Sequence, residues 1–283
     1  MFAVSNYQSI HMKKLLISLV VVILLASCAK VAFTGRSQAK LIPDAQINEM
    51  SFAQYSQYLS TNNAMTSGSE LAMVREIGDN LVKATEVYYK ANGLESELQN
   101  FQWEFNVIDD PTVNAFCMPG GKVVIYTGII DVAQNEDGLA VVMGHEIAHA
   151  LAHHGNERMT QGLIAQAGTA ALDIALREEP ALTRNILLTA VGLGAQIGVM
   201  LPFSRKHELE ADEIGLYLMT MAGYNPNEAA PFWQRMAGSG GQAPPEFLST
   251  HPNPQRRSTD LANLVSKSLE YKAKYPVPGS TRR

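Results

Sequence analysis

The stretch VVMGHEIAHALAHHG, residues 141–155, places four histidines and one glutamate among small and aliphatic residues. Within it, His145, Glu146 and His149 form the pattern His-Glu-x-x-His. If the segment is an α-helix, positions i and i+4 lie on one face about one turn apart, so the two histidines can converge on a single ion. The glutamate points to the neighbouring side, where it can reach a water molecule bound to that ion. The pattern predicts a zinc-peptidase helix.

A catalytic zinc site needs a third protein ligand and an open position for water or substrate. A metzincin would have glycine and histidine where this chain has Ala152 and Gly155. On a continuous helix, His154 lies on the wrong face, and His153 lies two turns from His145, too far to bind the same ion. Both extra histidines are therefore expected to be exposed or hydrogen-bonded structural residues.

The segment SRKHELEAD, residues 204–212, supplies the remaining candidates. On a helix, Glu208 and Asp212 are four residues apart and share a face, while Glu210 points elsewhere. A carboxylate ligand at the first position and a second carboxylate one turn later could bind zinc and orient a ligating histidine. Taken alone, such an acidic cluster is more often a solvated helix face. The His-Glu-x-x-His pattern makes the metal-binding interpretation the better one.

Composition and the N-terminus restrict the class of protein. The chain has 283 residues, 46% hydrophobic and 17% charged, which suits one medium globular domain. Residues 1–27 are expected to be a removed signal peptide, because Lys13 and Lys14 precede an apolar run followed by small residues. That run, Leu15–Ala26, is shorter than the about 20 residues of a membrane span, and a retained anchor helix is the alternative. Removing residues 1–27 lowers the net charge from −5 to −7, which argues against nucleic acid as a partner.

The two cysteines have different expected roles. Leu25-Ala26-Ser27-Cys28 resembles the lipobox of bacterial lipoproteins, which implies cleavage before Cys28, lipidation of its thiol and membrane anchoring through it. Met12 is a more usual start for such a signal than Met1. Cys117 is then alone, and we expect a small packed residue rather than a nucleophile.

Apolar spacing and turn residues predict a mostly helical chain with a small sheet ahead of the motif helix. Residues 28–43 are expected to form an irregular tether, 44–270 one domain and 271–283 a fraying tail. The motif helix should start near Asn135–Asp137, which offer N-caps, and stop at Gly155. Further helices are predicted at Asp44–Leu59, Glu70–Asn92, Glu157–Arg177, Ser204–Ala222, Asn227–Ala237 and Asn253–Leu269. Strands are predicted at Phe101–Val107 (half-buried, from its alternation), Val113–Cys117 and Lys122–Thr127.

Two stretches do not fit regular amphipathic elements. Ile186–Phe203 is almost wholly apolar over eighteen residues, but glycines interrupt it. We favour a buried or membrane-facing helix over a transmembrane span. Gly238–Pro245 is rich in glycine and proline and is expected to be flexible.

Four sequence blocks together resemble peptidase family M48: Asn114-Ala115-Phe116 with Pro119-Gly120-Gly121; Gly144 to His149; Ser204-Arg205 with Glu208 and Ala211-Asp212; and His251-Pro252 with Arg257. The resemblance is in particular to the small bacterial lipoproteins of this family, which are related to the mitochondrial protease called Oma. The resemblance implies an α+β, mostly helical zincin-like (gluzincin) domain with a small mixed β-sheet beside the motif helix. Within these blocks the sequence departs from the family pattern at Cys117, where the family more often has a small residue such as alanine.

The resemblance also assigns roles to residues. It implies one zinc ion per chain, held by His145, His149 and Glu208. Glu146 is then the catalytic carboxylate, and Asp212 binds a ligating histidine from behind and orients it.

Other candidate residues lie outside this set. His251 matches the family's His-Pro motif and is the candidate donor to the oxyanion of the transition state. Arg257 is a candidate for transition-state support, and a structural partner of a buried carboxylate is the alternative. An extended substrate would add a strand to an exposed sheet edge, at Asn114–Phe116 (with Asn114 and Ala115) or at Lys122–Thr127. Gly120-Gly121 is alternatively a tight hairpin turn, and both interpretations can hold together.

The leading hypothesis is a zinc metalloendopeptidase, lipid-anchored on the periplasmic face of the bacterial outer membrane, that cleaves misfolded or membrane-associated proteins. A non-catalytic, chaperone-like binding protein with the same fold is one alternative, and the intact Glu146 argues against it. A membrane-embedded protease that uses Ile186–Phe203 as a span is the other.

Overall fold

The computed structural model describes residues 28–175, 205–239, 246–251 and 254–280. Within these ranges the chain is mostly helical, with a three-stranded mixed sheet next to the motif helix, so the predicted α+β fold class is confirmed. The predicted signal peptide, the apolar stretch Ile186–Phe203 and most of the segment Gly238–Pro245 lie outside the described residues. None of the helices described is long and apolar enough to cross a membrane.

The elements are close to those predicted where both exist. The strands are β1 (Cys28–Lys30), β2 (Ser37–Ala39), β3 (Glu104–Ile108), β4 (Ala115–Met118) and β5 (Lys122–Tyr126). The helices are α2 (Asp44–Thr61), α3 (Ser69–Ala91), α4 (Thr127–Ala133), α5 (Glu136–Leu151), α6 (His154–Ala175), α8 (Arg205–Met221), α9 (Ala229–Gly238), α10 (Glu246–Thr250) and α11 (Pro254–Lys274), with short 3₁₀ turns η1 (Glu95–Leu98) and η2 (Pro226–Glu228). The strands β1 and β2 and the short helices α4 and α10 were not predicted.

The three-stranded sheet has the order β3–β5–β4, with β3 parallel and β4 antiparallel to the central strand β5. Strands β4 and β5 are joined through Gly120 and Gly121, which both have positive φ angles (81° and 89°). A Cβ on Gly120 would lie 2.5 Å from the ring of Phe52, so this turn needs glycine for its backbone and for its space. The tight-turn interpretation of Gly120-Gly121 is therefore correct.

The prediction that the first strand of the sheet is half-buried was wrong, because helix α2 covers the second face of the sheet. Phe105 and Val107 pack in the main core, while Ile108 packs on the other face with Tyr55 of α2. Even the polar Asn106 is buried, and its amide donates to the Tyr55 hydroxyl at 2.9 Å.

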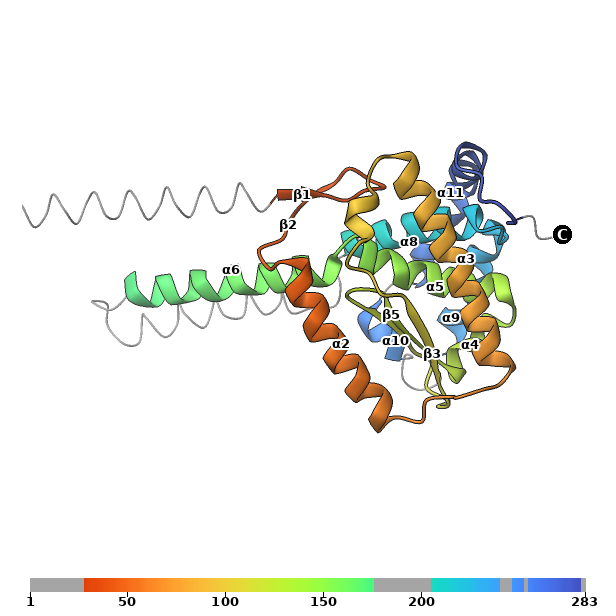
Figure 1. Ribbon diagram of the computed structural model, residues 1–283, viewed down its shortest axis with the longest axis horizontal. Helices are drawn as coiled ribbons and strands as arrows, with labels where there is room; N and C mark the ends of the chain where they lie inside the picture. The colour runs from red at the N-terminus through yellow and green to blue at the C-terminus, as the bar shows by residue number, and fades with distance from the viewer. Residues whose placement is uncertain (1–27, 176–204, 240–245, 252–253, 281–283) are drawn as a thin grey trace, which may run out of the picture.

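Helix α5 lies at the centre of the domain (Figure 1), and every residue from Gly138 to Leu151 is buried. Its N-cap is Asn135, whose side-chain oxygen accepts from the amide of Gly138 at 2.8 Å, as the sequence predicted. Helix α8 crosses α5 at a pair of glycines. A Cβ on Gly144 would lie 2.8 Å from the carbonyl oxygen of Gly215, so the two backbones touch and the side chains beside them are brought close.

Helix α5 ends at Leu151, earlier than the predicted stop at Gly155. His153 takes a positive φ of 51°, a left-handed conformation that histidine adopts more readily than most residues, and a new helix begins at His154. The prediction that placed His153 and His154 on the motif helix is therefore wrong. The change of direction turns His154 back towards His149.

Both ends of the described chain are more ordered than predicted. Residues 28–43 do not form an irregular tether, because β1 and β2 pair as an antiparallel hairpin and Val31 and Phe33 are buried in the main core. The tail is also packed: Tyr275 and Val277 are buried, and a Cβ on Gly223 would lie 1.9 Å from the carbonyl oxygen of Ser280.

Candidate metal centre

Four buried side chains from three parts of the chain meet beside the middle of α5. His145 and His149 come from α5, Glu208 from the first turn of α8, and His251 from the residue after α10. One possible ligand atom from each of the four lies within 4.8 Å of all the others. The i, i+4 spacing on α5 and the glycine crossing with α8 together produce this convergence.

The distances between these ligand atoms fit a tetrahedral zinc site. The Nε2 atoms of His145 and His149 are 3.0 Å apart, and they lie 3.6 and 3.5 Å from the carboxylate oxygens of Glu208. Donor atoms about 2.0–2.1 Å from one ion in a tetrahedron are about 3.3 Å from each other. Two imidazoles and a carboxylate are also donors that zinc prefers, so the three side chains proposed from sequence suit this ion.

Asp212 lies behind His145, one turn along α8 from Glu208. Its Oδ1 atom is 3.0 Å from Nδ1 of His145, so the Nδ1–H group can donate to it while Nε2 faces the other ligand atoms. Burial alone would raise the pKa of Asp212, but the neighbouring Arg257 guanidinium and His145 hold this pKa below its ordinary value. Asp212 therefore stays charged and fixes the orientation of His145.

Arg257 of α11 is 2% exposed and is held by the two carboxylates of α8. Its Nε donates to Asp212 Oδ2 at 2.7 Å, and its Nη1 lies 3.2 Å from Glu208 Oε2. The guanidinium also stacks on the ring of Trp233 at 3.4 Å from the centroid. These contacts correspond to the alternative left open by the sequence, a structural partner of buried carboxylates.

Glu146 lies on the side of the cluster that faces the sheet. Its Oε2 accepts from the backbone amide of Cys117 in β4 at 3.2 Å, and its Oε1 lies 3.6 Å from Nε2 of His251. Burial and the nearby Glu208 raise the pKa of Glu146 to about 7, although His251 acts in the opposite direction. A carboxyl group with this pKa can both accept and return a proton near neutral pH.

His251 was predicted to donate to the oxyanion, but it lies within contact distance of the proposed ligand atoms. Its Nδ1 is 3.2 Å from Nε2 of His145 and 3.0 Å from Oε2 of Glu208, and its ring stacks on Phe247. In this position it is a candidate fourth ligand. Its role as an oxyanion donor remains a prediction.

Asn114 and Ala115 lie at the start of the edge strand β4. The amide of Asn114 donates to Glu246 of α10 at 3.1 Å, which ties α10 to the strand, and Ala115 is buried. Neither side chain is among the ligand atoms of the cluster.

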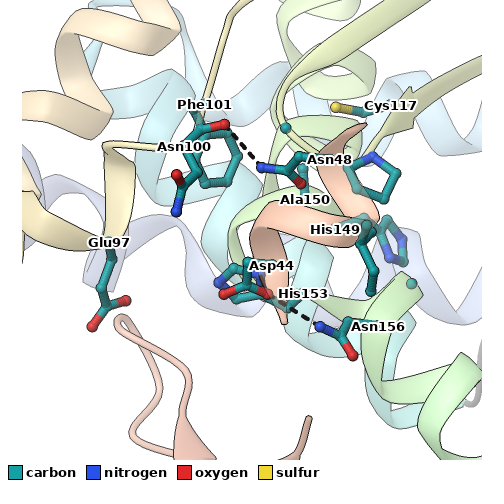
Figure 2. A pocket seen from close by; sticks show the side chains of 14 residues that line it. Asp44, Asn48, Glu97, Asn100, Phe101, Cys117, His149, Ala150, His153 and Asn156 are labelled. Carbon is teal, nitrogen blue, oxygen red and sulfur yellow. Dashed lines mark hydrogen bonds and ion pairs between the residues drawn. The ribbon is translucent and has the colours of Figure 1, made fainter. Parts of the chain in front are cut away.

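A cavity of about 60 Å³ opens next to His149, between the start of α2 and the end of α5 (Figure 2). Its polar wall includes Asp44 and Asn156, whose amide donates to Asp44 at 3.1 Å. Cys117 also lines it, and burial raises the pKa of the Cys117 thiol well above its ordinary value. This environment supports the predicted packing role of Cys117 over a nucleophilic one.

Residues 79–265, more than half of the chain, match the family model of peptidase family M48. The chain belongs to peptidase family M48. This confirms, at the level of the family, the prediction of a metallopeptidase, and the residues of the candidate metal centre all lie within the matched range.

M48 relatives occur in mitochondria and in bacteria. The mitochondrial metalloendopeptidase OMA1 of Schizosaccharomyces pombe is 41% identical over 166 residues, 57% of this chain and 46% of that protein. The protein of the same name in Saccharomyces cerevisiae is 36% identical over 205 residues, 67% of this chain and 55% of its own length. The beta-barrel assembly-enhancing protease of Escherichia coli is 30% identical over 172 residues, 58% of this chain and 35% of that protein. The chain thus spans between about a third and just over half the length of these relatives.

One group of contacts beside this M48 centre has no signal in the sequence. Glu210 points away from the face of Glu208 and Asp212, as predicted, but it is buried, and its Oε2 lies 2.9 Å from Nε2 of His154. His154 is hydrogen-bonded, one of the two predicted options, but its partner at 2.8 Å is Nδ1 of His149. No helical spacing signals this contact, because it depends on the break at His153.

Proposed function

We propose that this protein is a zinc-dependent endopeptidase, with His145, His149 and Glu208 as the protein ligands of the ion. The observation that carries the proposal is the convergence of these ligand atoms at 3.0–3.6 Å from one another, with the Glu146 carboxylate beside them and turned towards an edge strand. The relatives named metalloendopeptidases support the same activity.

The residues around the ligands have different roles in peptide hydrolysis. Zinc, when bound there, would supply a Lewis acid for the scissile carbonyl and activate the attacking water. Glu146 accepts the proton of that water and returns it to the leaving amine. Asp212 keeps the Nδ1 proton of His145 in place, so that Nε2 remains a ligand. Glu146 and the three proposed ligands are buried, which limits the access of bulk water to the proton transfer.

The substrate would bind as an additional strand on β4, which is the proposed role of Asn114 and Ala115. The amide of Tyr126 donates to the carbonyl of Asn114, so the alternation of an antiparallel pair leaves the backbone groups of Ala115 and Cys117 on the outer edge. Their amides donate there to the side chains of Asn114 and Glu146, and an added strand would replace these contacts. Among the described residues no strand pairs with this edge. The other predicted location, Lys122–Thr127, was wrong, because β5 is the central strand and both of its edges are paired.

A groove continues from the end of the edge strand. It has a volume of about 480 Å³, and Met118 and Pro119 are among the residues that line it. The sides come from α2 and α6, including Met50 and Met159. Flexible methionine side chains adapt to different apolar partners, so this groove suits a substrate chain with varied apolar residues.

Metal analysis of the purified protein tests the ligand set. We expect about one zinc per chain and complete loss of casein cleavage on treatment with a chelator, with recovery when zinc is added back. His149→Ala should lose metal and activity together, because it removes one of the three proposed ligands of the ion. Stoichiometric zinc in His149→Ala would contradict the assignment. His153→Ala is the matched control, since that histidine lies outside the ligand set.

Substitution of His251 tests its predicted role. If His251 donates to the oxyanion, His251→Ala should lower kcat by about 100-fold or more, with KM and zinc content nearly unchanged. If it is instead a fourth ligand, the same variant should bind zinc more weakly without that loss of kcat. If His251→Ala has a lower melting temperature and a normal kcat, the role of His251 is structural, through its packing against Phe247. Steady-state kinetics, zinc titration and melting temperature on one preparation separate these results.

For location we propose a lipid anchor at Cys28 on the periplasmic face of the bacterial outer membrane, with misfolded or membrane-associated proteins as substrates. The lipobox-like sequence and the bacterial relative named for beta-barrel assembly support this proposal. So does the surface of α6, which projects on the side where β1 begins (Figure 1) and carries exposed Leu163 and Ile174. The predicted subtype, a small bacterial lipoprotein, rests on the same argument.

The anchor is tested by Cys28→Ser. We expect this variant to leave the membrane fraction or to keep its signal segment uncleaved, because the thiol that would carry the lipid is absent. Fractionation after high-salt and carbonate washing, with mass spectrometry of the N-terminus, measures both outcomes. If the processed variant stayed in the membrane, another segment would hold it there, and the membrane-embedded alternative with Ile186–Phe203 would replace the lipid anchor.

A further inference from the structure

A second buried polar cluster lies beside the metal centre, and none of the roles above uses it. We call it the Arg36 cluster. Arg36 comes from the turn before β2, His154 and Glu157 from α6, and His207 and Glu210 from α8. His154 is completely buried and Glu210 is 6% exposed. His154, Glu157, His207 and Glu210 are buried, whereas the side chain of Arg36 keeps 11% of its surface exposed. Buried carboxylates and imidazoles are costly unless each is paired, so their placement beside the metal centre calls for a function.

A continuous path of hydrogen bonds joins the cluster to a zinc ligand. Nδ1 of His149 is 2.8 Å from Nδ1 of His154, and Nε2 of His154 is 2.9 Å from Oε2 of Glu210. The same oxygen of Glu210 accepts from Nε of Arg36 at 2.6 Å. The path therefore runs from the ligand on α5, through α6 and α8, to the N-terminal hairpin.

The direction of these hydrogen bonds follows from the position of the ligand atom. Nε2 of His149 faces His145 and Glu208, so in the zinc-bound protein the proton of His149 must be on Nδ1. His154 then accepts at Nδ1, and its own proton is on Nε2, where it donates to Glu210. His145 has the same kind of support in a shorter form, because Asp212 contacts it directly.

We propose that His154 and Glu210 are positioning residues for His149, and that Arg36 makes the N-terminal hairpin part of the support of the metal centre. The proposal rests on zinc ligation by His149. It extends the functional unit beyond the family match, because Arg36 lies outside residues 79–265. Thr34 of the same hairpin turn also donates to Glu210, so two hairpin side chains hold this carboxylate.

Two variants and one matched control test the proposal. Glu210→Gln and His154→Phe interrupt the path to His149. Glu157→Gln is the control: Glu157 is bound by the same guanidinium, at 2.9 and 2.8 Å, but it does not lie on the path. All three should destabilise the metal-free protein, since each removes a buried contact of the cluster. Only Glu210→Gln and His154→Phe should weaken zinc binding, by about 10–100-fold in Kd, as measured by competition with a chelator of known affinity.

The positions of the imidazole protons give an independent readout. In the zinc-loaded wild-type protein, nitrogen–proton correlation spectra of the histidine rings should show His149 protonated at Nδ1 and His154 at Nε2. In Glu210→Gln the His154 signal should broaden or shift, because its acceptor is weaker. This measurement stands even if His154→Phe does not fold.

The outcomes separate this proposal from the proposed function. Unchanged zinc affinity in Glu210→Gln, or an equal change in Glu157→Gln, would show that the cluster only stabilises the fold and would overturn the positioning role. A His154 ring protonated at Nδ1 would overturn it too. A wild-type chain that binds zinc but cleaves no protein would refute the endopeptidase and leave the positioning role supported by the affinities.

Discussion

Glu146→Gln should bind zinc as the wild-type protein does and lose about 1,000-fold or more in kcat. The carboxylate is beside the ligand atoms and not among them, so the substitution removes the proton acceptor and leaves the three ligands in place. The glutamine side chain has the same shape and can still accept from the Cys117 amide. Zinc analysis and casein cleavage on one preparation measure the two effects separately.

A matched control is available on the same helix. Glu136 lies exposed in the first turn of α5, and Glu136→Gln should leave both zinc content and kcat unchanged. If Glu146→Gln kept most of its activity, the residue would have no place in the mechanism. If the protein is instead a non-catalytic binding protein, the wild-type chain should bind zinc or substrate without any measurable cleavage.

Arg257→Met should destabilise the protein by about 3–5 kcal/mol, because it leaves two buried carboxylates without their common partner. Asp212 and Glu208 both contact the guanidinium, and methionine fills part of the volume over Trp233 without supplying charge. The loss should be largest in the metal-free protein. In the zinc-loaded protein the ion itself would neutralise Glu208. Urea unfolding of both forms measures the free energy of unfolding.

The neighbouring residue provides the control for this variant. Arg256 is exposed and pairs with Asp260 at 3.4 Å on the surface of the same helix. Arg256→Met should change the free energy of unfolding by no more than about 0.5 kcal/mol. Equal and small effects of the two substitutions would contradict the structural role of Arg257. A role in transition-state support would then return as the better explanation.

The convergence of the proposed ligands was predictable because part of its signal is local. The spacing of His145 and His149 fixes their shared face on any helix, and the same holds for Glu208 and Asp212. The N-cap at Asn135 also depends on neighbouring residues only. The contact between α5 and α8 is a tertiary contact and has no local signal. It was inferred because a catalytic zinc ion needs a third protein ligand.

The Arg36 cluster was not predictable in this way. Its contacts join residues 121 and 174 positions apart, and no short pattern marks either one. The break that turns His154 towards His149 is equally hidden. It occurs at a histidine with positive φ, whereas the sequence offers a glycine two residues later. Burial of Val31 and Phe33 likewise depends on the helices they meet, so residues 28–43 looked like a linker.

With the proposed lipid at Cys28, the N-terminal hairpin would determine how far from a membrane the domain could act. A free linker of the length of residues 28–43 could extend by up to about 55 Å from its attachment point. The hairpin prevents this extension, because β1 begins at Cys28 and the chain packs against the domain within a few residues. A lipid at Cys28 would therefore hold the catalytic domain at the bilayer surface. It would meet its substrates by lateral diffusion in the plane of the membrane, and proteins farther into the aqueous space would be beyond its range.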